Sequence, residues 1–599
     1  MERGSSVKAH VFWKKYENRM IAIAAILINI VVLSLLFDFY YDLNDDCFMR
    51  DIMSGSYTGT PDGHNVQTLY VLGAFISLFY RLCRPLPWYG VFLIFCQFGS
   101  LYAVGARLLR FCHSISAKIG CMVIYTLFLW GVILSHMNSL HYTFISAMMA
   151  ASAMFLFLTT PKGLTAKKFV VQNIPSVLLV ILAYQLRTEI LLLLFPFICL
   201  AGLFRWSEEE KFFEKENYIK YGIVLGCIVA GMLGSRAIDL VAYGSGEWKQ
   251  FLTFFNERTE VYDYHAGILT DEEYLHSIGV SDAQMAMFSN YNFGLDENIN
   301  AELMGEIADH ARENTDYAAR IPDAVRQYIY RTLHSQDMPY NGLVIVMYCC
   351  IVLAGIYGAF TGAGWSFLWK LILTGMVRTS LWMFILVRGR YPERITHSLY
   401  IAEAVLLLGV LCMQLVKLNW MRFEQGDGEA GERGSKAMPK GVFIICALIS
   451  LLCICYLPRS VKNALSDEEY REGSHDIGQV IAQYCRSHPE NYYFKDVYST
   501  VGASQKIFQD VDNGLANHDI MGGWLCKSPL YDEKMGQFGI TSMEEGLLYH
   551  ENVYFIAGKN DDTTWLLAHY AGKGIAVSVE QADSLSEFYA VYRVKEIDG

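Results

Sequence analysis

Charged residues are scarce in this sequence. Of the 599 residues, 18% are Asp, Glu, Lys or Arg, 53% are hydrophobic, and the mean hydropathy is +0.25. A soluble domain carries about 25% charged residues, so the composition excludes a chain of ordinary soluble domains. Positive charge is also in the minority, because the net charge is −12 and the pI is near 5.7. Without a basic surface to contact phosphates, nucleic-acid binding is disfavoured.

Several catalytic motifs are absent too. The sequence contains no Walker loop, no HExxH, no CxxC pair and no GxSxG, so nucleotide-driven pumping, zinc proteolysis and serine hydrolysis lack their usual residues. The 15 Cys lie mostly inside apolar runs, where Cys acts as a small hydrophobic residue, and their number says little about the compartment. Cys485 and Cys526 can form a disulfide in an oxidising exterior or remain free thiols.

Long apolar runs, by contrast, are abundant. They cover about 17 to 24 residues, the length that a helix needs to cross a hydrocarbon core of about 30 Å. The first run, Met20 to Phe37, follows a basic N-terminus and has no cleavage site after it, so it predicts an uncleaved anchor with a cytoplasmic N-terminus. The fold class is therefore a polytopic α-helical membrane protein with about 11 transmembrane helices. The further runs lie near 86–105, 119–135, 142–158, 169–186, 190–204, 219–235, 341–360, 365–387, 398–416 and 440–457.

One further apolar stretch, Gln67 to Cys83, is predicted to lie in the outer membrane interface rather than to cross. If it crossed, the Lys/Arg-rich short loops would not all be cytoplasmic, against the positive-inside rule. The interfacial assignment places the basic loops 106–118, 160–168, 205–220 and 417–440 inside.

This topology leaves two sizeable parts outside the plasma membrane. The loop 237–340 is acidic, with 18 Asp/Glu against 6 Lys/Arg; its residues 301–333 have helical periodicity, and 256–300 have the composition of a loop. Short apolar or alternating runs after Pro458 predict a small α/β domain. The predicted division is a transmembrane module, 1–458, with first outer loop 38–66, interfacial helix 67–83 and long outer loop 237–340, followed by an extracytoplasmic α/β domain, 459–599.

The first outer loop contains paired carboxylates in the sequence Asn44-Asp45-Asp46, about seven residues beyond the first helix. Two adjacent carboxylates at a membrane surface can act as a general base or bind a divalent metal, because repulsion and partial desolvation raise one pKa. The alternative is a solvated loop that is merely acidic. A tight Gly/Pro turn then leads to His64 and the interfacial stretch.

This order of features resembles the GT-C superfamily of integral-membrane glycosyltransferases. The resemblance covers an N-terminal helix, a first outer loop with paired acidic residues, a Gly/Pro turn and an interfacial helix, over about residues 1–240, with the multi-helix character continuing to 457. It implies transfer of a sugar from a polyprenyl-phosphate or pyrophosphate carrier at the outer face, with a first-loop aspartate acting on the acceptor. The sequence lacks the WWDYG-type signature of oligosaccharyltransferases and the KPP-type turn of the aminoarabinose transferases.

A second polar region is the turn Arg388-Gly-Arg390-Tyr-Pro-Glu-Arg394-Ile-Thr-His397. Its three arginines defy the positive-inside bias, so something on the outer side should favour the positive charge. The planar guanidinium group suits phosphate oxygens, and the carrier's phosphate is one ligand that fits. The alternative is that these arginines pair with the acidic long loop or with lipid headgroups.

Other polar residues near helix ends are candidates for the same site. Arg187 and Glu189 share an outer turn, and Arg378 lies inside an apolar run with Glu403 of the next run as an available ion-pair partner. A structural ion pair explains them equally well. His136, Asn138 and His141 occupy another short outer turn.

The resemblance and these residues together predict an inverting, lipid-carrier-dependent glycosyltransferase, transferring a hexose or pentose, with Asp45 or Asp46 as general base. A transporter or flippase of lipid-linked sugars is the alternative, although no paired halves are visible; a scaffold would not need so many helices. The expected partners are a lipid-linked donor, membrane lipids and a glycan, lipid or protein acceptor, with a divalent metal optional. Substrate-binding residues are predicted to be His64, Arg187, Glu189, Arg378, Arg388, Arg390, Arg394 and His397.

Overall fold

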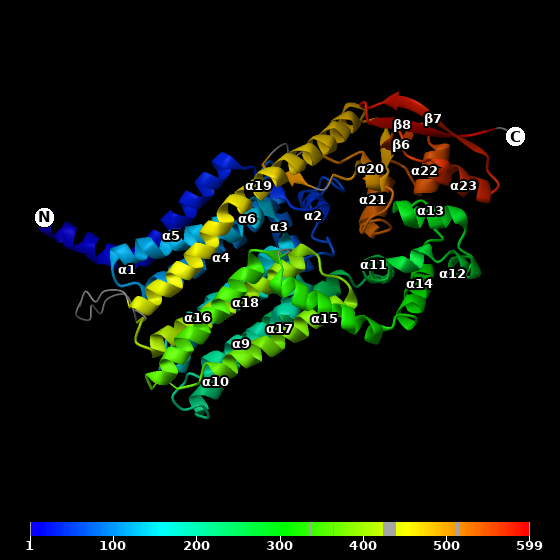
Figure 1. The fold of residues 1–599 in the computed structure, drawn as a ribbon. Coiled ribbons are helices and arrows are strands. Elements are labelled where there is room, and N and C mark those ends of the chain that lie inside the picture. The colour runs from blue at the N-terminus through cyan, green and yellow to red at the C-terminus, as the bar shows by residue number, and fades with distance from the viewer. Residues whose placement is uncertain are drawn as a thin grey trace.

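The protein is a bundle of membrane-length helices with a mixed α/β part at one end (Figure 1). The computed structural model describes residues 2–334, 337–362, 364–422, 439–502, 504–508 and 514–597, without the side chains of residues 2–15. Within these residues, ten helices are long and apolar enough to cross a membrane. They are α1 (Glu2–Leu36), α4 (Trp88–Leu108), α5 (Ile115–Val132), α8 (Ala166–Leu186), α9 (Thr188–Trp206), α10 (Lys215–Ala242), α16 (Tyr340–Phe360), α17 (Leu368–Arg388), α18 (Glu393–Lys417) and α19 (Lys440–Ser487).

An eleventh apolar helix, α7 (Tyr142–Leu158), occupies the centre of the bundle. Every residue of α7 except Phe157 is buried, and the helix packs against α4, α8, α9 and α18. A helix that is apolar all round needs such an enclosed position. The predicted polytopic helical fold with a small C-terminal sheet domain is thus confirmed, with α7 completing the predicted set of about eleven helices.

The stretch predicted to be interfacial forms α3 (Tyr70–Leu82), which packs against α2, α4, α8 and α10. Its 13 residues extend about 20 Å, which is less than the roughly 30 Å of a hydrocarbon core. The helix is therefore too short to cross by itself.

The described part of the segment 237–340 is folded into helices almost throughout. The sequence predicted that residues 256–300 are loop-like, and the helices found there correct this prediction. Asp271 and Ser281 are N-caps whose side chains accept hydrogen bonds from Tyr274 and Gln284. These small polar residues indicated a loop in the sequence because capping and turn residues are the same types. The elements are α11 (Gly246–Tyr264), η2 (Ala266–Thr270), α12 (Glu272–Ser277), α13 (Asp282–Asn290), α14 (Ala301–Glu313) and α15 (Tyr317–Leu333).

The C-terminal part contains a five-stranded sheet with the order β5-β3-β6-β8-β7. Strand β3 (Tyr492–Lys495) is parallel to β5 (His518–Ile520) and β6 (Val553–Gly558), whereas β8 (Tyr589–Glu596) is antiparallel to β6 and to β7 (Val577–Ser584). The associated helices are α20 (Val497–Thr500), α21 (Pro529–Gln537), α22 (Met543–Tyr549) and α23 (Thr564–Gly572).

The sheet and the segment 237–340 share one apolar core. Phe254, Met287 and Phe293 of that segment are buried in the same cluster as Tyr492 and Phe555 of the sheet. Helix α19 runs without interruption for 48 residues from the bundle to this sheet, so the predicted boundary at 458/459 falls inside a helix (Figure 1). We call the end of the bundle that carries α2, α11–α14 and the described residues after 487 the domain end.

Three short strands tie the domain end to the bundle. Strand β1 (Tyr40–Tyr41) pairs in parallel with β2 (Ser139–Leu140) and antiparallel with β4 (Gln505–Lys506). They join the loop after α1, the turn after α6 (Leu134–Asn138) and the segment after β3. Helix α2 (Asn44–Ser54) follows β1 and is thereby held against the bundle; η1 (Leu109–Phe111) extends α4 at the other end.

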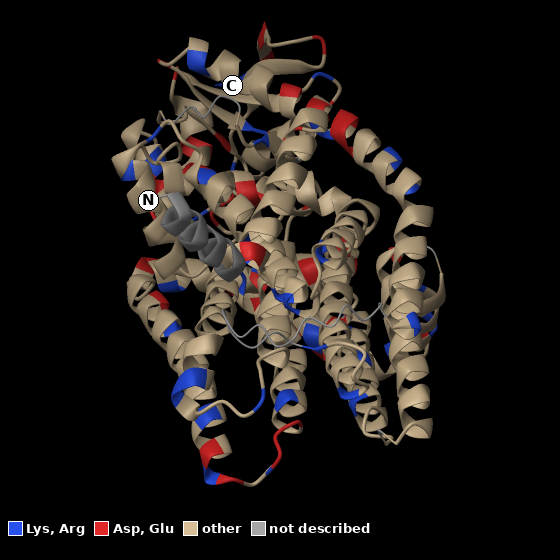
Figure 2. Cartoon of the chain, turned by 90° about the vertical axis from the view of Figure 1, so that its left-hand side faces the viewer, with Lys and Arg blue, Asp and Glu red and all other residues tan. Residues whose placement is uncertain are grey.

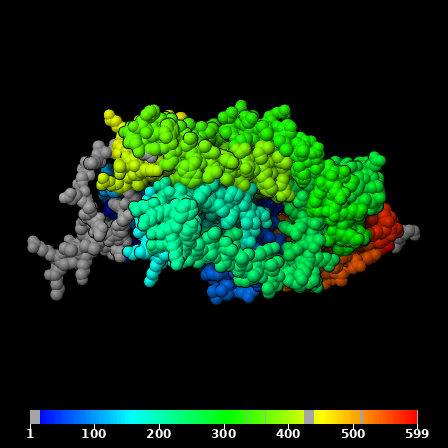
Figure 3. All heavy atoms as spheres, turned by 90° about the horizontal axis from the view of Figure 1, so that it is seen from below, coloured from blue at the N-terminus to red at the C-terminus, as the bar shows by residue number. Residues whose placement is uncertain are grey.

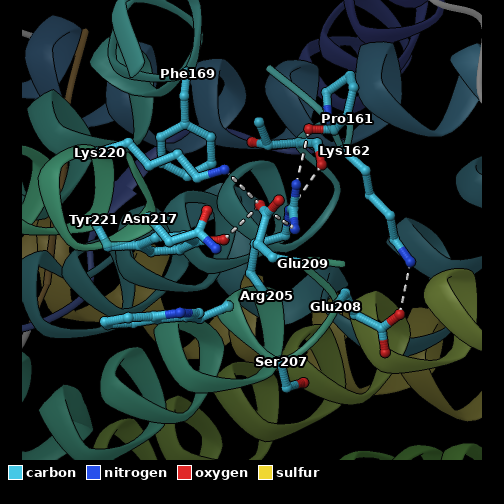
Figure 4. A network of polar contacts seen from close by, with 12 residues as sticks. Pro161, Lys162, Phe169, Arg205, Ser207, Glu208, Glu209, Asn217, Lys220 and Tyr221 are labelled. Atoms are coloured by element: carbon cyan, nitrogen blue, oxygen red, sulfur yellow. Dashed lines mark hydrogen bonds and ion pairs between the residues drawn. The ribbon is translucent and has the colours of Figure 1, made fainter. Parts of the chain in front are cut away.

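The ribbon segments coloured for Lys, Arg, Asp and Glu lie mostly near the ends of the outer helices, with long stretches of other residues between them (Figure 2). At the end opposite the domain end, the charges form a buried network (Figure 4). Glu209 Oε1 lies 3.0 Å from both Arg205 Nη1 of α9 and Lys220 Nζ of α10. Buried ions need such partners, and this network fixes the ends of several helices. Its other members are the carbonyls of Thr160 and Pro161, which accept from Arg205, and Lys162 and Lys370, which pair with Glu208.

Candidate active site

Asp45 and Asp46 lie in the first turn of α2 but in different environments. Asp46 is fully buried, and Tyr89 of α4 donates a hydrogen bond of 2.6 Å to its Oδ1. The other oxygen, Oδ2, has no hydrogen-bond partner within the described residues. Burial raises the pKa of Asp46 well above its usual range; the neighbouring Asp45 adds to this, and the Tyr89 hydrogen bond opposes it. Asp46 therefore favours its protonated form.

Asp45 is the more accessible of the two carboxylates, since it is only half-buried. It lies within electrostatic range of Tyr142 at the start of α7, of Arg187 between α8 and α9, and of Asp263 at the end of α11. Its position in the first turn of α2 also places it at the positive end of the helix dipole. Asp45 is thus a half-buried carboxyl group within electrostatic range of Arg187.

Arg187 is held in place by several contacts. Its Nη1 donates to Gln67 Oε1 at 2.5 Å, its guanidinium carbon lies 5.1 Å from the centre of the Tyr142 ring, and its Nε lies 3.0 Å from a carboxylate oxygen of Glu189. The Glu189 side chain is 70% exposed, so solvent screens this pair. Arg187 is therefore a fixed cation within electrostatic range of Asp45.

The three arginines of the turn 388–397 differ in their contacts with α11. Arg390 Nη1 lies 2.5 Å from Asp263 Oδ2, and Arg388 Nη2 lies 3.6 Å from Glu260 Oε2. Arg388 and Arg390 thus pair with the acidic segment 237–340, which is one of the two alternatives offered by the sequence. Arg394 has no ion pair within the described residues, and its charge acts on His141, Tyr142 and Asp263.

Asp263 faces this group of cations. Burial raises the pKa of its carboxyl, whereas Arg390, Arg258 and Arg394 lower it, in that order. Sequence analysis did not single out Asp263. The residue belongs to the site only because α11 contacts a turn that follows it by more than 120 residues in the sequence.

Arg378 and Glu403 form a buried ion pair between α17 and α18. Tyr348 of α16 donates to the other carboxylate oxygen of Glu403 at 2.9 Å, so both charges are compensated. This geometry is the structural pair that the sequence offered as one alternative.

His397 also lies inside the protein. Its Nδ1 lies 2.9 Å from His136 Nε2, and its ring stacks on Tyr340 with centroids 4.1 Å apart. Burial lowers the pKa of His136 to about 4, against the opposing effect of Asp42. The two imidazoles can therefore share one hydrogen bond as neutral rings.

Asn138 and His141, the other two polar residues of the outer turn that contains His136, have different environments. The amide of Thr143 donates to His141 Nδ1 at 2.9 Å, and His141 Nε2 has no hydrogen-bond partner among the described residues. Burial lowers the pKa of His141 to about 3. Asn138 donates to Glu468 of α19 at 3.4 Å.

His64 connects two elements of the domain end. Its Nδ1 lies 2.6 Å from Asp62 Oδ1, and its ring stacks on Trp248 of α11 and contacts Tyr70 and Tyr243. These contacts fix the Gly/Pro turn against α10 and α11.

Besides Asp263, sequence reasoning missed three residues near the site: Asp42, Tyr89 and Arg471. Arg471 Nη2 of α19 lies 2.6 Å from Asp42 Oδ1, which also accepts from Ser139 at 2.7 Å. Burial raises the pKa of Asp42, but the lowering effects, led by His141 and Arg471, are larger together. The pKa of Asp42 is therefore below its usual value. Asp42 was visible as an acidic residue before the pair; Tyr89 and Arg471 carry no local signal.

The space-filling view shows a hollow on one face of the molecule (Figure 3). In the space-filling view it opens between teal segments of the first half of the chain and yellow-green segments of the second, with blue N-terminal residues at its base (Figure 3). Among the described residues, no group of three or more His, Cys, Asp or Glu is arranged to hold a metal ion.

Comparison with known proteins gives little to build on. No protein-family model matches the chain, and no curated protein matches it. Among solved structures, the chain is similar to the crystal structure of ArnT from Cupriavidus metallidurans in the apo state, with 10% identity and a TM-score of 0.39 over 95% of this chain and 97% of that one. A likeness at this TM-score establishes neither a shared fold nor a shared function. The chain is an integral membrane protein by its own helices.

Proposed function

We propose that this protein is a GT-C-type glycosyltransferase that moves a sugar from a polyprenyl-phosphate or pyrophosphate carrier to an acceptor at the domain end. One observation carries the proposal: a half-buried carboxylate, Asp45, lies within electrostatic range of Arg187 and of Tyr142, and Arg394, which has no ion pair among the described residues, acts on the same Tyr142. A base and cations at the ends of membrane helices are what a lipid-linked phosphate donor and a hydroxyl acceptor require.

In this mechanism Asp45 takes the proton of the acceptor hydroxyl while the acceptor oxygen bonds to the anomeric carbon. The bond from that carbon to the carrier phosphate oxygen breaks, and its electron pair remains on the phosphate. Arg187 and Arg394 stabilise the charge that develops there. The single displacement inverts the anomeric configuration.

Asp46 supports this division of roles by remaining neutral. With its pKa raised by burial, Asp46 adds no second negative charge next to Asp45. The arginines then offer a larger net positive field to the phosphate. We assign Asp45 as the base and Asp46 as the residue that positions α2 through Tyr89.

Orientation follows from charge. The end opposite the domain end carries the basic segment with Lys162, Lys167 and Lys168, which favours a cytoplasmic location. We therefore place the domain end, with the active site and the C-terminal sheet, outside the plasma membrane.

The test uses purified protein in nanodiscs with a panel of polyprenyl-phosphate sugars labelled in the sugar. The proposal predicts that label leaves the carrier and appears in an acceptor fraction from membrane extracts, with stoichiometric free polyprenyl phosphate. The same donors, tested with the protein in sealed vesicles, distinguish glycosyl transfer from the alternative function, a flippase of lipid-linked sugars. If the intact lipid-linked sugar crosses the membrane and its sugar–phosphate bond is never cleaved, the protein is a flippase and the proposal is wrong.

A further inference from the structure

Helix α15 lies beside a membrane-spanning helix, although it belongs to the segment 237–340 that the sequence placed wholly outside. Tyr328 and Thr379 of α17 share a hydrogen bond of 3.2 Å. Arg378 donates to Tyr328 at 3.2 Å and to Thr332 at 3.3 Å. These contacts align the second half of α15 with the middle of α17.

The two helices run antiparallel from the domain end. Near the start of α15, a guanidinium nitrogen of Arg320 lies 3.8 Å from where a Cβ would stand on Gly389, which directly follows α17. Arg378 is ten residues before Arg388 along α17, a distance of about 15 Å. Thr332 therefore lies about halfway across a core of roughly 30 Å.

The end of α15 has the hydrogen bonding that a location at membrane depth demands. Asn341 donates to the carbonyls of Arg331 and His334 at 3.0 and 2.8 Å, and Tyr400 donates to the Arg331 carbonyl at 3.1 Å. The Arg331 side chain is buried against Asp337 at 2.9 Å. Irregular backbone at membrane depth occurs only where protein groups satisfy it in this way.

The side of α15 turned away from the protein carries an apolar stripe along its length. Four aliphatic residues recur at every fourth position and are 42–62% exposed. The charged residues Asp323 and Arg326 on this side lie in the first two-thirds of the helix and pair with each other. Beyond Arg326 no charged side chain is exposed on α15. The aliphatic residues are Ile321, Val325, Ile329 and Leu333.

We propose that α15 is a re-entrant membrane helix whose apolar face contacts the acyl chains of bilayer lipids. The exposed face of its neighbour α17 includes Ile372, Met376 and Phe384, and it is a lipid-facing surface in any spanning helix. The α15 stripe lies beside the Phe384 half of that face, between the levels of Arg378 and Gly389. Helix α15 thereby anchors the segment that carries Asp263 in the membrane. This inference does not depend on the proposed glycosyl transfer.

The test places the photoreactive residue p-benzoylphenylalanine at Ile329, at Ile321 or at Glu313. Glu313 is the control, because it is exposed on α14 outside the bundle. The full chain is reconstituted in nanodiscs of phosphatidylcholine and phosphatidylglycerol, irradiated, and searched for phospholipid adducts by mass spectrometry. We expect at least about fivefold more adduct at position 329 than at 313, since benzophenone reacts with the C–H bonds it contacts, and an appreciable yield at 321.

Two results would overturn the inference. Equal lipid adduct at 329 and 313 would place α15 in water. A crosslinked dimer of the chain at 329, in place of lipid adducts, would mean that a second copy covers the stripe. Melting temperatures of the three variants, compared with that of the native chain, identify a variant that has failed to fold, and Val325 is then used in place of Ile329.

Discussion

Asp45 and Asp46 are neighbours in sequence, yet their surroundings give them different chemistry. Asp46 is fully buried under Tyr89, and Asp45 is half-buried near Arg187. From the sequence, either residue could have been the base. The choice depends on desolvation, which arises only when α4 packs on α2 and which no local pattern encodes.

The raised pKa of Asp46 predicts a pH dependence of stability. A carboxyl with a raised pKa in the folded state contributes stability that is present at low pH and is lost as the pH rises through the folded pKa. Each unit of upward shift corresponds to about 1.4 kcal/mol. Asp46→Asn should therefore melt at the same or a higher temperature than the native chain at pH 8, with a smaller fall between pH 6 and pH 8. An Asn variant with an unchanged or steeper fall would show that Asp46 is ionised.

Arg394 is predicted to contribute more to donor binding than its neighbours in the turn. It has no ion pair within the described residues, whereas Arg390 already pairs with Asp263. Arg394→Gln should weaken binding of a polyprenyl phosphate about 10-fold to 100-fold, the range expected from loss of a charged hydrogen bond, and Arg394→Lys should lie between. Calorimetric titration in detergent measures this, with exposed Arg326→Gln as the control. Unchanged affinity in Arg394→Gln would move the phosphate site to Arg187.

At the level of elements, the domain end is joined by contacts that are distant in sequence. Asn292, after α13, inserts its side chain at the carboxyl end of β3: its Nδ2 donates to Asp496 Oδ1 at 2.6 Å, and the amide of Val497 donates to its Oδ1 at 3.0 Å. This fixes the segment 237–340, including α11 and Asp263, against the sheet. The C-terminal part therefore supports the arginine turn indirectly.

Removing this amide should loosen the domain end. Asn292→Ala removes the donor to Asp496 Oδ1 and the acceptor for the buried Val497 amide, while Ser499 still donates to Asp496 Oδ2. Such losses cost about 1–3 kcal/mol of stability. Limited proteolysis should then cut within 265–300 at lower protease concentration. Asn298→Ala, an exposed residue six positions later, is the control and should behave like the native chain. Identical proteolysis of the two variants would contradict the role of Asn292.

The membrane helices could be predicted from the sequence because each helix that crosses a bilayer needs a long apolar run. Helix α7 was found for the same reason, since it is apolar on every side. The folding of 256–300 into helices was not predicted, because Asp271 and Ser281 are as typical of turns as of caps. The pairing of Arg390 with Asp263 depends on tertiary structure alone.

At the level of the whole molecule, the proposed orientation places residues 488–599 outside the cell. Glu587→Cys and Lys162→Cys, both at exposed positions at opposite ends, test this with an impermeant thiol reagent on intact cells. The Glu587 variant should label before lysis and the Lys162 variant only after it, each compared with the native cysteines as background. The reverse pattern would invert the topology.

Asp45 carries the central claim, and one measurement tests it most directly: the initial rate of sugar transfer from a saturating polyprenyl-phosphate donor to the acceptor fraction, in native protein, Asp45→Asn and the exposed control Asp476→Asn. General-base catalysis contributes about 100-fold to 10,000-fold. The account predicts a loss of that size in Asp45→Asn alone, with donor affinity and melting temperature close to the native values. An Asp45→Asn rate within about threefold of the native rate, far below any general-base contribution, would contradict the assignment of Asp45 as the base.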